Sequence, residues 1–96
     1  IGRVIATIRS REEFEDENWL TIVCTDHGGS GLNHGGGRDI PDVRNTFLIV
    51  NGPDARRGKS DEATYQVDVV ATALTHLRVK LKPEWELDGR AVGLDE

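Results

Sequence analysis

Several residue types that build the frameworks of small proteins are absent or nearly absent from this chain. Its 96 residues contain no methionine and a single cysteine, Cys24. One cysteine excludes an internal disulfide framework. The absence of an initiator methionine fits a mature product, or a piece of a longer protein.

Apolar residues are also scarce. They make up 36% of the chain, which is low for a domain that folds by itself. No apolar run approaches the roughly 20 residues that span a bilayer, and the N-terminus lacks the pattern of a secretory signal. The net charge of -5 argues against a nucleic-acid-binding surface. The length suits one small domain with a modest core.

The pattern of apolar residues predicts four regular elements. A helical face spans residues 1–8, where apolar residues recur at a spacing of three and four. Nearly continuous apolar runs predict strands at Thr21 to Thr25 and at Asn45 to Asn51. A second amphipathic helix is predicted from Tyr65 to Arg78, and the glycine-rich segment from Gly28 to Asp42 is predicted to be a loop.

The order helix, strand, loop, strand, helix indicates an α/β layered fold. Two strands do not make a stable sheet alone, so further strands are expected from a parent chain or a partner. Within the first predicted strand, Cys24 is expected to be a small buried side chain. Asp68 is expected to lie in the first turn of the second helix, where the helix dipole favours an acid.

The candidate site follows the first predicted strand. Asp26 and His27 come directly after its apolar run, and His34 follows in the glycine-rich loop. Ligands of open α/β sheets bind beyond the carboxyl ends of strands. Carboxylate and imidazole ligands suit Zn²⁺ or Mn²⁺, and Gly28 permits a turn that aims both side chains at one ion. An Asp-His pair in this position can equally be a structural cap of the loop.

The run Thr25-Asp26-His27-Gly28-Gly29 followed by His34-Gly35 resembles the C-terminal part of the alkaline phosphatase superfamily. The resemblance is greatest to its type I phosphodiesterase/nucleotide pyrophosphatase and sulfatase-like branches. Later segments resemble the same family in the same order: Phe47 to Pro53 resembles the strand after the metal loop. Asp68, Thr72 and Leu74 match its D-x-x-x-T-x-L helix, and Asp88-Gly89 its closing turn.

The resemblance implies an alkaline-phosphatase-like three-layer sandwich, with residues 1–96 forming a single domain from the C-terminal part of a larger metal-dependent hydrolase. Asp26 and His27 would bind the ion that holds the nucleophile, and His34 would bind a second ion. The cofactors would be two divalent metal ions, with Zn²⁺ favoured over Mn²⁺. The substrate would be a small phosphate monoester, phosphate diester or sulfate ester. Family members are often exported, which favours an extracytoplasmic location.

The same family carries its nucleophile and its other metal ligands in the N-terminal half, which nothing in this chain matches. We therefore expect no catalytic nucleophile here, and expect this chain alone to be inactive. Two other interpretations remain open. The loop could belong to a non-catalytic module that binds metal or supports structure, or to a degenerate piece of the fold that binds no metal.

Overall fold

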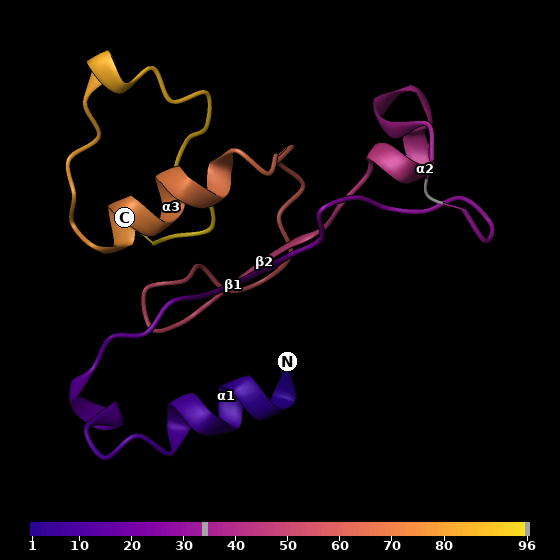
Figure 1. Ribbon diagram of the computed structural model, residues 1–96. Coiled ribbons are helices and arrows are strands. Elements are labelled where there is room, and N and C mark those ends of the chain that lie inside the picture. The colour runs from indigo at the N-terminus through magenta and orange to yellow at the C-terminus, as the bar shows by residue number, and fades with distance from the viewer. Residues whose placement is uncertain (34, 96) are drawn as a thin grey trace.

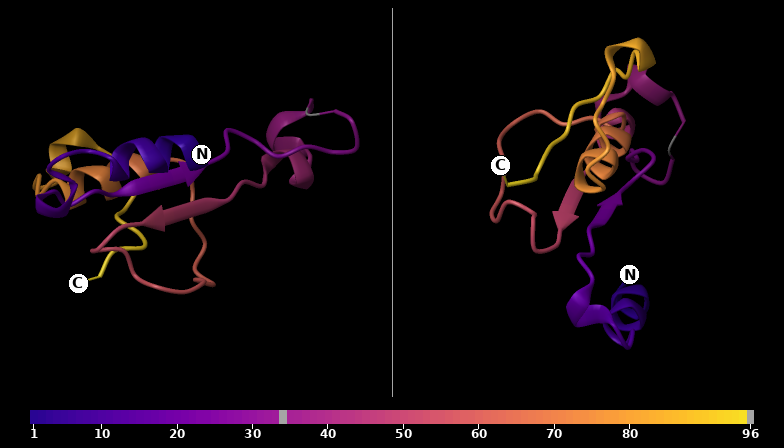
Figure 2. Two further views of the ribbon diagram at one scale, coloured as in Figure 1. Left: turned by 90° about the horizontal axis from the view of Figure 1, so that it is seen from below. Right: turned by 90° about the vertical axis from the view of Figure 1, so that its left-hand side faces the viewer.

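The computed structural model describes residues 1–33 and 35–95, in which a short two-stranded sheet is accompanied by three helices (Figure 1). The helices are α1 (Gly2–Arg9), α2 (Pro41–Arg44) and α3 (Asp68–His76), and the strands are β1 (Thr21–Cys24) and β2 (Leu48–Asn51). Both orientations in Figure 2 show α2 beyond one end of the sheet, on the side where β1 ends. The element order agrees with the prediction apart from α2, and the three-layer sandwich stays a prediction.

The two strands are antiparallel, with Thr21 opposite Asn51 and Cys24 opposite Leu48. Both are shorter than predicted, because pairing stops at Cys24 and Leu48. The sheet is only partly covered: Ile49 is 52% exposed, and Cys24 is exposed as well. The prediction of a buried Cys24 is therefore wrong. The apolar residues around Cys24 are typical of a strand that is covered on both faces. The sheet has two strands, however, and Cys24 lies in the last residue pair between them, where its side chain is exposed.

Helix α2 begins at Pro41, inside the segment predicted to be a loop, and continues past its predicted end at Asp42 to Arg44. Pro41 occupies the first turn, where its fixed φ favours a helix and its missing N–H costs no hydrogen bond. A 3₁₀ turn at Gly37–Asp39 leads into it. The side chain of Val43 in α2 is 2% exposed, so this short helix supplies one of the buried apolar groups.

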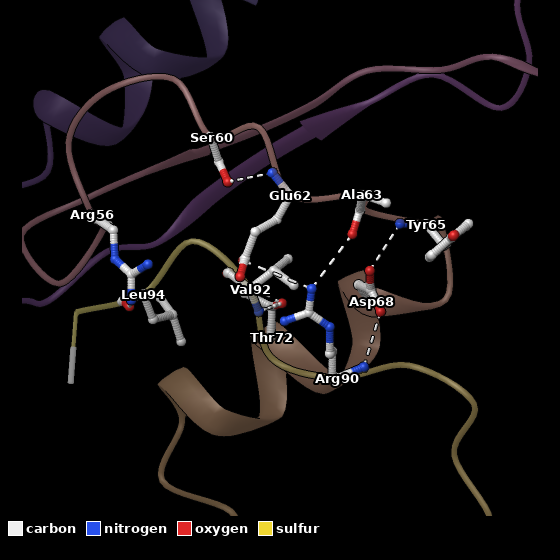
Figure 3. Close-up of polar contacts among 10 residues, drawn as sticks. All are labelled: Arg56, Ser60, Glu62, Ala63, Tyr65, Asp68, Thr72, Arg90, Val92 and Leu94. Carbon is white, nitrogen blue, oxygen red and sulfur yellow. Dashed lines mark hydrogen bonds and ion pairs between the residues drawn. The ribbon is translucent and has the colours of Figure 1, made fainter.

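Helix α3 is tied to the C-terminal tail through buried polar groups (Figure 3). The Asp68 side chain is 2% exposed, and its carboxylate accepts hydrogen bonds from the backbone N–H groups of Tyr65 at 2.8 Å and Arg90 at 2.9 Å. One turn later, Thr72 Oγ1 accepts a bond from the Val92 N–H at 3.0 Å. The predicted first-turn position of Asp68 is confirmed, and its carboxylate also fastens the tail to the helix.

A glycine allows this close approach of the tail. A Cβ atom on Gly89 would lie 2.0 Å from the carbonyl oxygen of Val67, so only glycine fits against the residue that precedes α3. The regular part of the helix is shorter than the predicted Tyr65 to Arg78. Its lead-in nevertheless starts at Tyr65, whose carbonyl accepts the Asp68 N–H at 2.9 Å.

Two polar clusters hold the segment between α1 and β1. Glu17 accepts hydrogen bonds from Arg11 and from the indole N–H of Trp19. These bonds lower the pKa of Glu17 to about 2, and the bonds from Arg11 have the larger effect. His76 Nε2 donates to the Asn18 carbonyl at 2.9 Å, which joins the end of α3 to this segment.

The apolar core is small. Among the described residues, four apolar side chains are buried, namely Val43, Ala55, Ala71 and Val92. The radius of gyration is 15.6 Å, against about 13 Å for a compact domain of 100 residues. No helix in the described part of the chain combines the length and apolar character that crossing a bilayer requires.

We expect Asp68→Ala to lower the free energy of unfolding by about 2–3 kcal/mol, because two N–H groups lose a charged acceptor. Asp68→Asn should cost less, since its amide oxygen can still accept one of the two bonds. Urea unfolding followed by tryptophan fluorescence measures both values. Unchanged stability in both variants would show that the carboxylate does not hold these N–H groups.

Candidate metal centre

Asp26 and His27 lie just past the end of β1, as predicted, and their side chains face each other. His27 Nε2 is 3.4 Å from Asp26 Oδ2, while Asp26 Oδ1 accepts the backbone N–H of His27 at 3.0 Å. The side chains are 87% exposed for Asp26 and 41% exposed for His27. The pair is therefore open to solvent.

A backbone carbonyl sets the tautomer of His27. Nδ1 lies 2.6 Å from the Gly28 carbonyl oxygen, which can only accept, so Nδ1 is assigned the proton. In the neutral imidazole, Nε2 then carries the lone pair on the side of the Asp26 carboxylate. Histidines that bind metals are typically held in this way, by a carbonyl that accepts the other ring N–H.

The distance between the two side chains suits a shared ion. Zn²⁺ binds His nitrogen and Asp oxygen at about 2.0–2.2 Å, and tetrahedral angles then place two such ligand atoms about 3.4 Å apart. Asp26 Oδ2 and His27 Nε2 have this separation. An oxygen and an imidazole nitrogen also form a donor set that accepts Zn²⁺ or Mn²⁺. The pair thus fits the metal that the sequence predicts.

The loop after this pair is held against α2. Gly28 N–H donates to the Val43 carbonyl at 2.7 Å. A Cβ atom on Gly28 would lie 2.0 Å from the Asp42 carbonyl oxygen and 2.6 Å from that of Asn45. Gly28 is therefore required by close backbone approach, in addition to the tight turn for which it was predicted. Further on, Ser30 and Asn33 exchange two backbone hydrogen bonds.

Sequence reasoning missed one residue that contacts this site. The side-chain amide of Gln66 donates to the carbonyl oxygens of Thr25, at 2.8 Å, and Asp26. Gln66 belongs to the lead-in of α3, far along the chain from both acceptors. In the sequence, Gln66 is marked only by its place two residues before Asp68, at the start of the predicted helix. That place does not reveal which loop its side chain contacts.

The third predicted ligand, His34, lies outside the described residues. Over residues 1–33 and 35–95, no group of three or more His, Cys, Asp or Glu side chains could hold an ion together. Both oxygens of the Asp68 carboxylate already accept backbone N–H groups, those of Tyr65 and of Arg90 in the tail. Asp68 is therefore not counted as a metal ligand. Asp26 and His27 are the two predicted ligands that the structure brings together, and an ion bound by them needs further ligands.

Two larger hollows lie elsewhere. One of about 670 Å³ separates α1 from the turn after β2, with Ile8, Trp19 and Pro53 among its lining residues. The other, of about 780 Å³, runs along β2 beside Arg57 and Lys59. Neither is lined by Asp26 or His27.

Comparisons with known proteins add no assignment. No protein-family model matches the chain, and no match was found among curated proteins or solved structures.

We expect Gly28→Ala to displace the Asp-His pair, because the added methyl group would meet two backbone carbonyls. The amide signals of residues 26–28 should shift or broaden in a ¹H–¹⁵N spectrum. Gly35→Ala, in the same loop, is the matched control, since its nearest neighbour is the Asn33 side chain at 3.4 Å. Equal spectra for wild type and Gly28→Ala would contradict the close packing of Gly28.

Proposed function

We propose that this chain supplies one side of a two-metal active site in a hydrolase of phosphate or sulfate esters. The observation that carries the proposal is the 3.4 Å separation of Asp26 Oδ2 and His27 Nε2, together with the Gly28 carbonyl that fixes the imidazole. The motifs that resemble the alkaline phosphatase superfamily supply the reaction class.

In this proposal Asp26 and His27 hold one divalent ion and His34 binds a second. The Gly28 carbonyl keeps the proton on Nδ1, so that the imidazole offers Nε2. When bound, the ions would lower the pKa of the attacking hydroxyl and stabilise negative charge on the transferred group. The nucleophile and the remaining ligands come from protein outside this chain.

The exposure of the pair supports a shared site. Asp26 is 87% exposed, and electrostatic stabilisation is weak where water reaches the reacting groups. A catalytic centre here therefore needs a second protein segment over the Asp-His pair. The same segment would supply the missing ligands.

We expect the chain to bind Zn²⁺, and Asp26→Asn and His27→Ala each to weaken binding by more than about 10-fold. Calorimetry with Zn²⁺ and with Mn²⁺ measures the effect. Asp61→Asn, at an exposed position outside the helices and strands, controls for the loss of one charge. Equal affinity in His27→Ala and wild type would exclude the imidazole as a ligand.

A second candidate function is a non-catalytic module that binds one ion. It is supported by the same geometry, since Asp26 Oδ2 and His27 Nε2 lie 3.4 Å apart. Metal binding alone does not separate it from the hydrolase, because both use the same pair. Catalysis by the protein that contains the chain is what distinguishes them.

We expect that protein, when it includes the coding sequence upstream of Ile1, to hydrolyse p-nitrophenyl phosphate, bis(p-nitrophenyl) phosphate or p-nitrophenyl sulfate. Chelation should abolish activity, and Asp26→Asn should lower kcat/KM by about 100-fold or more, since a catalytic metal supplies several kcal/mol. Upstream, the sequence should contain a strand ending in Asp and then a Ser, Thr or Cys nucleophile. Metal binding without turnover of any ester would favour the non-catalytic module.

A further inference from the structure

We infer that Gln66 is a positioning residue for the metal site, an inference that rests on the proposed function. Its side-chain amide joins the lead-in of α3 to the end of β1, through the carbonyls of Thr25 and Asp26. These carbonyls belong to the two peptide groups on either side of the Asp26 Cα atom.

The end of β1 needs such a contact because β2 does not hold it. Strand pairing ends at Cys24 opposite Leu48, so Thr25 and Asp26 lie beyond the ladder. In a regular strand successive residues face opposite ways, which would separate the side chains of Asp26 and His27. Two consecutive carbonyls that meet one nitrogen require the chain to leave strand geometry at this point.

The amide of Gln66 matches this task. Its NH₂ group has two hydrogens, one for each carbonyl oxygen. With both bonds made, the peptide after Thr25 is held on one side, and the turn that follows brings Asp26 Oδ2 and His27 Nε2 to 3.4 Å. Gln66 contacts neither of these two atoms, so its effect on an ion is exerted through the backbone.

Gln66 is itself held from both sides. The Tyr65 N–H donates to the Asp68 carboxylate at 2.8 Å, and the Gln66 carbonyl accepts the Val69 N–H at 3.1 Å. The bond from the Tyr65 N–H to a carboxylate three residues later closes the turn before α3. The side chain therefore extends from an anchored turn, and it can impose a direction on the Asp26 backbone.

The test is Gln66→Met, which keeps the length of the side chain and removes both donors. Tyr65→Phe is the control, because the Tyr65 side chain is 64% exposed and its backbone bonds are unchanged. We expect Gln66→Met to weaken Zn²⁺ binding by about 10- to 100-fold, the usual effect of losing a group that orients a ligand. Tyr65→Phe should bind as wild type does.

A second measurement, without metal, separates this inference from the proposed function. The ¹⁵N order parameters of Asp26 and His27 should fall from about 0.85 toward 0.6 in Gln66→Met, while those of Thr72 and Val92 stay unchanged. If these order parameters do not fall, Gln66 does not position the pair.

Zn²⁺ binding of wild-type strength in Gln66→Met, combined with its loss in Asp26→Asn, would overturn the role of Gln66 and keep the metal site. No Zn²⁺ binding by any variant, combined with the expected drop in order, would overturn the metal site and keep Gln66 as the residue that orders this loop.

Discussion

The buried carboxylate of Asp68 is the interaction on which the rest of this structure depends. An ionised group at 2% exposure is costly unless hydrogen bonds compensate it. Here the compensation comes from the N–H groups of Tyr65 and Arg90, which belong to separate segments. One side chain thereby fixes both the turn before α3 and the tail that lies on that helix. Gln66, which donates to the carbonyls of Thr25 and Asp26, extends from the same turn.

Polar contacts carry so much of the architecture because the apolar core is small. Apart from Val43 and Val92, the buried apolar side chains of the described residues are alanines. Larger groups remain exposed in β2 and directly before it, such as Ile49 and, at 49%, Phe47. The segments are instead held together by close contacts between backbone atoms at Gly28 and Gly89. Hydrogen bonds of the Asp68 and Gln66 side chains add to these contacts. A further layer of protein over the sheet would bury the apolar side chains that are now exposed.

The elements that carry strong apolar periodicity were predictable, and those that depend on distant contacts were not. Residues 1–8 and both strands follow from their apolar patterns, and α2 was missed because its composition is that of a loop. The exposure of Cys24 depends on how many strands the sheet contains, which a local pattern does not encode. The place of Asp26 and His27 just past a strand was predictable, and their role as metal ligands stays a prediction. The hydrogen bonds of Gln66 to the carbonyls of Thr25 and Asp26 were not predictable, since they join segments far apart in the chain.

Asp26 and His27 are neighbours in the sequence, and this adjacency has a thermodynamic consequence. Their separation is limited by a single peptide bond, so an unfolded chain also keeps the carboxylate and the imidazole within reach of one ion. A ligand stabilises a fold only by the difference between its affinities for the folded and unfolded states. Any ion at this pair would therefore stabilise the chain by less than its affinity suggests. Its strongest effect on stability would come through ligands that only the folded assembly brings together.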